Sequence, residues 1–141
     1  MKERWESYRR EYESNVRIAR SLHKLLSDLD DGQTIVVVEG RRDRQALKSL
    51  GYNGRVFEMC GKGKGTKNLV SELAVYKKVI VMFDFDKRGE RLTRTIVEKL
   101  TYGGLTIDLT TRRKIKEIAY DVEHIEDLKR FSKYLIEELS V

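Results

Sequence analysis

Three acidic residues follow two apolar segments of this chain, and their positions allow metal-dependent chemistry. Glu39 follows the apolar run 34–38, while Asp84 and Asp86 come at and just beyond the end of the run 79–83. Short apolar runs bounded by glycine and charge are typical of strands buried on both faces of a parallel sheet. Open α/β folds bind ligands at the carboxyl edge of such a sheet, where the strand order reverses. We therefore expect the three carboxylates to converge there.

The spacing of the two aspartates favours a divalent cation. In extended geometry Asp84 and Asp86 share one face, about 7 Å apart, and Phe85 turns toward the packing side. Oxygen ligands without His or Cys suit a hard ion, and Mg²⁺ typically takes one or two carboxylates and keeps several waters. The pattern predicts Mg²⁺, with Mn²⁺ as an alternative. Glu39 is then either a third ligand or a proton shuttle.

Two glycines and a fourth acid accompany these carboxylates. Gly40 and Gly89 are expected to let the backbone turn sharply, and Gly89 comes just before a predicted helix whose N-terminus favours an anion. Asp43 lies one turn into the helix that follows Glu39. Structural roles are the alternative for every acid, because an isolated Asp-x-Asp can be a turn with a helix cap and Asp43 can form surface ion pairs.

Basic residues are concentrated in the same part of the chain. Residues 34–100 hold fifteen basic and eight acidic side chains, so the formal net charge of +6 lies in the middle. Acids ringed by Lys and Arg suit a polyanion bound through metal and phosphate, although a solvated basic face is the alternative. The predicted phosphate-binding residues are Arg41, Arg42, Lys62, Lys64, Lys67, Lys87 and Arg88.

A glycine-lysine loop spans residues 61–67 and begins at Gly61. Its backbone N–H groups and three lysines suit a phosphate, yet the loop does not match the P-loop pattern. Phosphate binding and a solvated loop both remain open.

Predicted strands and helices alternate along the chain, and together they must position these residues. Their alternation predicts an α/β, Rossmann-like fold with a parallel sheet of roughly four strands flanked by helices. One compact domain is expected, with an N-terminal helical extension (1–33), a core (34–110) and a C-terminal helical extension (111–141). The predicted strands are 34–38, 55–60, 79–83 and 105–109, and the predicted core helices are 41–50, 68–76 and 90–100.

Both extensions have helical apolar periodicity. In the first thirty residues a stripe runs from Trp5 to Leu29 and includes Asn15, a polar residue of the kind that sets register between paired helices. Packing of the stripe within the monomer is favoured over pairing with a second chain or a protein partner. The tail is predicted to form a basic helical turn at 112–119 and then an amphipathic helix.

Composition excludes several classes of protein. One cysteine and two histidines exclude a disulfide framework and a structural zinc site, and Cys60 is expected to be buried. No apolar stretch has the length of a membrane span, and the first residues lack the apolar core of a signal peptide. We expect a cytoplasmic protein that does not bind membranes.

As a set, the motifs resemble the toprim domain over about residues 34–110. The shared features are Glu-Gly after the first strand, a glycine-bearing loop after the second and Asp-x-Asp-x-x-Gly after the third. The resemblance implies that Glu39 acts as general acid or base or joins the metal site, while Asp84 and Asp86 hold Mg²⁺. Chain size and terminal helices are most similar to small stand-alone toprim proteins, so topoisomerase and primase activities are not expected.

The resulting hypothesis is an Mg²⁺-dependent toprim protein that acts on nucleic-acid phosphodiesters, most simply as a nuclease. Structured RNA is the first expected substrate, by analogy with ribosomal-RNA-maturing nucleases. The alternatives are a non-catalytic nucleic-acid-binding adaptor or subunit that retains the metal site, and a nucleotide-binding protein.

Overall fold

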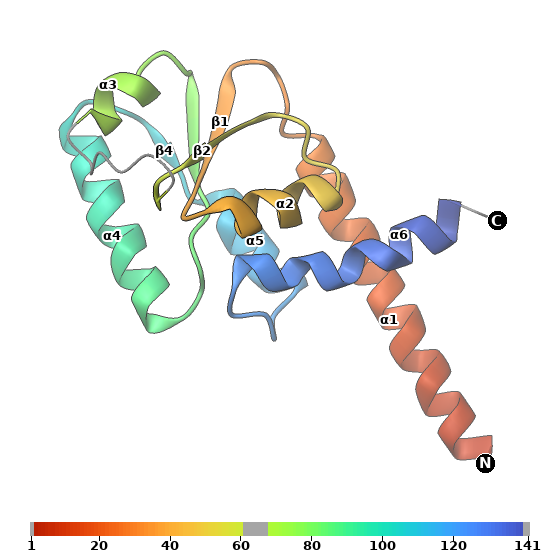
Figure 1. Cartoon of the computed structure of the whole chain (residues 1–141). Helices are drawn as coiled ribbons and strands as arrows, with labels where there is room; N and C mark the ends of the chain where they lie inside the picture. The colour runs from red at the N-terminus through yellow and green to blue at the C-terminus, as the bar shows by residue number, and fades with distance from the viewer. Residues whose placement is uncertain (1, 61–67, 140–141) are drawn as a thin grey trace.

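A four-stranded parallel sheet forms the centre of the computed structural model, which describes residues 2–60 and 68–139 (Figure 1). The strand order is β2-β1-β3-β4, and all three neighbouring pairs are parallel. This arrangement confirms the predicted α/β class and parallel sheet. The strands are β1 (Thr34–Val38), β2 (Arg55–Glu58), β3 (Lys78–Val81) and β4 (Ile107–Asp108).

Helices cover both faces of the sheet and form two apolar cores. Val36 and Val38 point into the core built with α1, α2, α5 and η2, whereas Ile35 and Val37 point into the core built with α3 and α4. The alternation follows from the pleat of β1, which sends successive side chains to opposite faces. The helices are α1 (Lys2–Ser27), α2 (Arg41–Ser49), α3 (Leu69–Leu73), α4 (Lys87–Tyr102), α5 (Thr110–Ile118), the 3₁₀ helix η2 (Ile125–Phe131) and α6 (Ser132–Leu139).

The order in which the chain adds strands to the sheet reverses between β1 and β3. After β1 the chain passes through α2 to β2 on one side, then returns past β1 to β3 on the other side. Because α2 and α4 lie on opposite faces, the carboxyl ends of β1 and β3 border the crevice expected at such a switch point. Glu39 follows β1, and Asp84 lies three residues beyond the end of β3.

Element boundaries differ from the sequence expectations near the acids. The strand predicted over residues 79–83 ends at Val81, although Met82 N–H still donates to Val37 O of β1 at 2.8 Å. The helix expected at 90–100 begins earlier, at Lys87, because Asp86 caps it. Ile125, Leu128 and Phe131 recur every third residue, which suits a 3₁₀ helix, and η2 spans them.

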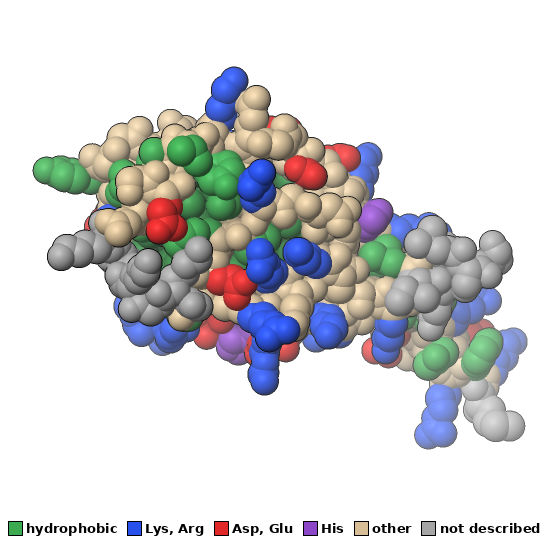
Figure 2. Space-filling model, turned by 45° about the horizontal axis from the view of Figure 1, so that its top comes forward, with side chains coloured by type: hydrophobic (Ala, Val, Ile, Leu, Met, Phe, Trp, Pro, Cys, Tyr) green, Lys and Arg blue, Asp and Glu red, His purple; other side chains and the backbone are tan. Residues whose placement is uncertain are grey.

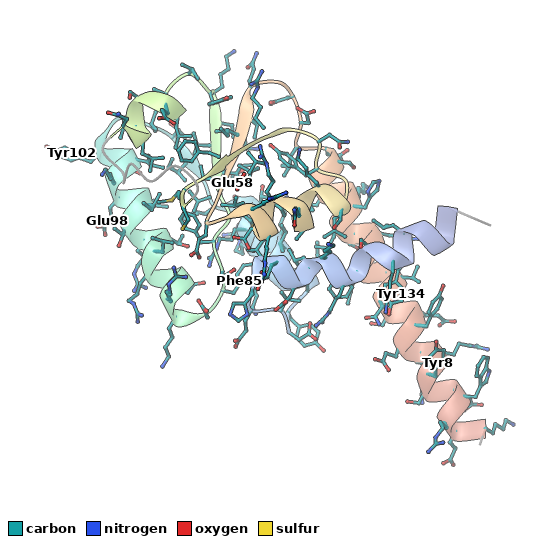
Figure 3. The ribbon with its side chains drawn as sticks, viewed as in Figure 1. Tyr8, Glu58, Phe85, Glu98, Tyr102 and Tyr134 are labelled. Atoms are coloured by element: carbon teal, nitrogen blue, oxygen red, sulfur yellow. The ribbon has the colours of Figure 1, made fainter. Side chains whose placement is uncertain are left out.

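The part of α1 from Tyr12 onward packs on the body of the protein, whereas its first two to three turns do not. Ala19, Leu22 and Leu26 are fully buried, whereas Trp5 and Tyr8 are 64% and 62% exposed and stack on each other. Figure 1 shows the N-terminal part of α1 extending away from the other elements, and Figure 3 places Tyr8 on that part. Packing of the stripe within the monomer is therefore confirmed from Tyr12 onward and not for Trp5 and Tyr8.

The polar residue of the stripe has a partner within the chain. Asn15 Nδ2 donates to Tyr134 Oη at 3.1 Å, and the Tyr134 ring meets Tyr12 edge to face. These contacts join α1 to α6. Despite the length of α1, no helix among the described residues is long and apolar enough to cross a membrane.

Candidate metal centre

Asp84, Asp86 and His124 form the central group of the candidate site. One ligand atom from each lies within 4.8 Å of the others. His124 Nε2 is 3.3 Å from Asp86 Oδ2. Burial opposes a charge on the ring, but the charges of Asp84 and Asp86, together with those of Asp127 and Glu123, raise the pKa of His124 above its ordinary value. The imidazole thus lies in the negative electrostatic field of these carboxylates, where a cation would also bind.

Backbone hydrogen bonds on both sides of His124 hold it beside the aspartates. Asp84 Oδ1 accepts from Ile125 N–H at 2.8 Å, and Phe85 N–H donates to Glu123 O at 2.7 Å. The segment after β3 is therefore attached to the segment before η2. Phe85 packs against the first core, as predicted, and Arg112 and Lys116 of α5 lie over its ring at 4.8 and 5.2 Å.

Arg112 of α5 fixes the backbone that carries the first aspartate. Its Nε donates to Phe83 O at 2.9 Å, and its Nη2 donates to Asp84 O at 2.6 Å and to Glu90 Oε1 at 2.8 Å. The Arg112 side chain is almost fully buried, whereas Glu90 is about half exposed, so the bond to Phe83 O is the one that is buried. Arg112 is a positioning residue, although its sequence context predicted only a basic helical turn without a role. Its spacing from buried Ile115 and Ala119 was the available signal.

Asp86 serves both the fold and the site. Its Oδ1 accepts from Gly89 N–H at 2.7 Å and so caps α4. Gly89 is required here because a Cβ at this position would collide with the Asp84 carbonyl oxygen. Gly40 differs, since its backbone is extended and a Cβ would meet nothing within 4 Å.

Glu39 faces a pocket that it shares with Asp84. The pocket has a volume of about 340 Å³ and is also lined by Gly40, Asp43 and Glu126. Glu39 Oε2 pairs with Arg88 Nη1 at 2.8 Å, whereas Oε1 is buried without a hydrogen-bond partner among the described residues. Glu39 is outside the group formed by the aspartates and His124 but adjoins it through this pocket.

Asp43 is buried beside the other acids. It is 9% exposed, and its Oδ2 accepts from Gly40 N–H at 3.2 Å. Burial, followed by the charge of Asp84, raises the pKa of Asp43 to about 6. The alternative of surface ion pairs for Asp43 is therefore wrong, because the side chain turns inward toward the pocket.

Basic side chains border the acids. Arg41 and Arg42 are exposed at the start of α2 and line the pocket, and Lys87 and Arg88 are exposed at the start of α4. Figure 2 shows Lys and Arg beside acidic side chains and a histidine on one face of the molecule. The other predicted phosphate-binding residues, with the glycine before them, lie outside the described residues: Gly61, Lys62, Lys64 and Lys67.

Two sequence expectations change here. Cys60 is exposed and lines the pocket, so the expectation of a buried thiol is wrong. The strand β2 ends at Glu58, before Cys60 can be covered. His124 was missed as a candidate ligand because it lies 38 residues beyond Asp86, and an isolated histidine in an acidic stretch carries no local motif.

The donor set fits a divalent cation. Two carboxylates and one imidazole offer three ligand atoms, and Glu39 adds a buried oxygen that still lacks a partner among the described residues. A buried, unpaired carboxylate oxygen is costly unless a cation or proton satisfies it. Asp84, Asp86 and His124 would hold the ion, with Glu39 beside it.

Known proteins resemble this chain over most of its length. The chain is 30% identical over 114 residues to a UPF0292 protein of Thermococcus sibiricus, which covers 77% of this chain and 86% of that one. It is 30% identical over 118 residues to a UPF0292 protein of Pyrococcus abyssi, covering 83% and 86%. A solved structure, a putative protein from Aquifex aeolicus, superposes with a TM-score of 0.64 and 28% identity over 77% of this chain and 95% of that one.

A family model that matches the core of the chain identifies its family. The Toprim domain model matches residues 34–120, which include β1 to β4, α5 and both aspartates. Toprim domains form a metal-binding fold that acts on nucleic acids, and an acidic group able to hold a metal is present at the expected edge of the sheet. This chain belongs to the Toprim domain family.

Proposed function

We propose that this protein is a divalent-metal-dependent enzyme that hydrolyses phosphodiester bonds in nucleic acid. The observation that carries the proposal is the grouping of Asp84, Asp86 and His124 within 4.8 Å, next to the pocket that contains Glu39. A bound divalent ion supplies Lewis-acid stabilisation of the charge on a scissile phosphate. Structured RNA is the first substrate to test.

The surrounding residues have distinct roles in this proposal. Asp84 and Asp86 hold the ion through the oxygens that the fold leaves available. The carboxylate of Glu39, which lines the pocket, takes a proton from the attacking water or returns one to the leaving oxygen. Arg88 is 64% exposed and can leave Glu39 to bind a backbone phosphate.

Arg41, Arg42 and Lys87 extend the phosphate-binding surface around the pocket. Contacts to phosphate position a nucleic acid but carry no sequence information. We therefore expect weak sequence preference and strong dependence on salt.

Asp84→Asn tests the enzyme directly. Asn keeps an oxygen that can accept from Ile125 N–H, so the loop after β3 is preserved while a negative charge is removed. Cleavage of labelled structured RNA, single-stranded RNA and duplex DNA is measured with Mg²⁺, with Mn²⁺ and with EDTA. The wild type should cleave at least one substrate only with metal, and the variant should lose cleavage while binding nucleic acid in EDTA as well or better.

Two further variants sharpen this experiment. Glu39→Gln should slow cleavage by about 10²–10⁴-fold, the usual contribution of a general acid or base. Asp121→Asn is the matched control, because Asp121 is an exposed acid that pairs with Arg130 at 2.9 Å, and it should leave cleavage unchanged.

A non-catalytic adaptor is the second candidate, and the exposed pair Trp5 and Tyr8 on α1 favours it by offering an apolar surface to a partner. Binding of metal and nucleic acid without cleavage by any variant would support the adaptor and overturn the enzyme.

A further inference from the structure

We propose that His124 makes this centre selective for Mn²⁺ over Mg²⁺, by adding an imidazole nitrogen to a carboxylate ligand set. The inference rests on the proposed metal-dependent function and adds the identity of the ion.

The aspartates present one oxygen each to the same space as His124. Asp84 Oδ1 accepts from Ile125 N–H and Asp86 Oδ1 accepts from Gly89 N–H, so the Oδ2 atoms remain for a cation. The three ligand atoms lie within 4.8 Å of one another. Ligands about 2.1 Å from a shared ion are at most about 4.2 Å apart, so small side-chain rotations complete the set.

Each ring nitrogen of His124 faces a carboxylate. Its Nε2 faces Asp86, at 3.3 Å from Oδ2, and its Nδ1 lies 3.6 Å from Asp127 Oδ2. A histidine that binds a metal through one ring nitrogen usually donates from the other to a carboxylate, which fixes the tautomer and the orientation of the ring. Asp127 lies at ion-pair distance from Nδ1, slightly beyond hydrogen-bond range, and a small rotation of its exposed side chain would make it the positioning residue.

A second, independent observation also indicates a cation in this place. Glu39 is about nine-tenths buried and faces the pocket it shares with Asp84, and its Oε1 has no hydrogen-bond partner among the described residues. An uncompensated carboxylate oxygen next to two further carboxylates is costly without a positive charge close by. Arg88 satisfies only the other oxygen.

The imidazole changes which ion fits best. Mg²⁺ prefers oxygen ligands and near-ideal octahedral geometry, and it gives up its waters reluctantly. Imidazole binds first-row transition ions better, and Mn²⁺ also accepts carboxylates readily. A set of two carboxylates and one imidazole therefore favours Mn²⁺, which reverses the preference predicted from the acidic motifs alone.

The test is a comparison of Mn²⁺ and Mg²⁺ affinities in the full-length protein. Calorimetry at about pH 8, where competition from protons is small, gives Kd for both ions in the wild type and in His124→Ala. Free and bound Mn²⁺ are counted independently by electron paramagnetic resonance. His23→Ala, which removes the other imidazole of the chain, is the matched control, and circular dichroism confirms that each variant is folded.

We expect His124→Ala to weaken Mn²⁺ binding by about tenfold or more, the scale on which the supporting groups of a ligating histidine act, with little change for Mg²⁺. His124→Asp should restore an all-oxygen set and strengthen Mg²⁺ binding relative to Mn²⁺. Asp127→Ala should weaken Mn²⁺ binding in the same direction as His124→Ala.

Equal loss of both ions in His124→Ala, or no loss of either, would overturn the selectivity inference while leaving the metal centre in place. Failure of the wild type to bind either ion would overturn the inference and the proposed function together. Selective Mn²⁺ binding without any cleavage would support the inference and contradict only the enzymatic function.

Discussion

Replacing Asp43 by Asn should stabilise the metal-free protein at neutral pH. Asp43 is buried, and burial together with the charge of Asp84 raises its pKa from 3.8 to about 6. The folded state therefore holds this proton more tightly than the unfolded chain does. As pH rises from about 4 to about 6, the unfolded chain releases its proton first, so the free energy of unfolding falls.

The size of the effect follows from the two pKa values. The difference between about 6 and 3.8 is about 2 pH units, and at about 1.4 kcal/mol for each unit it corresponds to about 3 kcal/mol. This penalty is complete above about pH 7 and nearly absent at about pH 4. Asn escapes it, because it carries no charge and keeps an oxygen for the N–H of Gly40, which Asp43 Oδ2 accepts now.

Urea denaturation in EDTA at about pH 4 and about pH 7.5 measures the prediction. Asp43→Asn should raise the free energy of unfolding by up to about 3 kcal/mol at the higher pH and by less than about 1 kcal/mol at the lower pH. Asp28→Asn, at an exposed position of the chain, should change it by less than about 0.5 kcal/mol at both. A variant less stable than the wild type at neutral pH, or a gain independent of pH, would refute the argument.

Three further predictions test the supporting structure. Gly89→Ala should weaken metal binding and lower the thermal midpoint, because the Cβ of the new alanine would collide with the Asp84 carbonyl oxygen. An unchanged metal affinity by calorimetry would contradict this prediction. Arg88→Gln should strengthen metal binding by about two- to fivefold, because it removes a cation that competes with the metal at a mostly exposed site. It should also lower the salt slope of nucleic-acid binding by about one. If the affinities for metal and for nucleic acid both rose or both fell, Arg88 would not have the two roles of competing with the metal and binding phosphate. Leu22→Ala should cost about 2–5 kcal/mol in chemical denaturation, whereas Trp5→Ala should cost less than about 0.5 kcal/mol in a dilute sample; similar costs would mean that the outer half of α1 is also packed.

Local sequence determined the parts of the fold whose causes are local. The apolar run 34–38 formed β1 at the predicted bounds, because it is continuous, β-branched and bounded by polar residues. The glycine of Asp-x-Asp-x-x-Gly also proved necessary at Gly89, where the start of α4 approaches the Asp84 carbonyl. Asp86 also fills the structural alternative considered for Asp-x-Asp, because it caps α4, and that role leaves its second oxygen for a cation.

Long-range packing decided the rest. The apolar stripe of α1 has the same helical periodicity along its whole length, yet only the part that meets α5, η2 and α6 is buried. Likewise, Asp43 has the sequence context of a surface helix residue, and its burial follows from the packing of α2 against η2.

The candidate site shows the same division. Its carboxylates could be placed from sequence because parallel strands bring their carboxyl ends to one edge. His124 and Arg112 could not, because they come from the segments after β4 and reach the site only when the chain folds back on the loop after β3. Periodicity and motif spacing report short-range geometry, whereas these contacts depend on hydrogen bonds between residues 28 and 41 positions apart. The sequence by itself determined the sheet, its edge and the two aspartates, and the tertiary structure alone decided that an imidazole joins them and an arginine holds them in place.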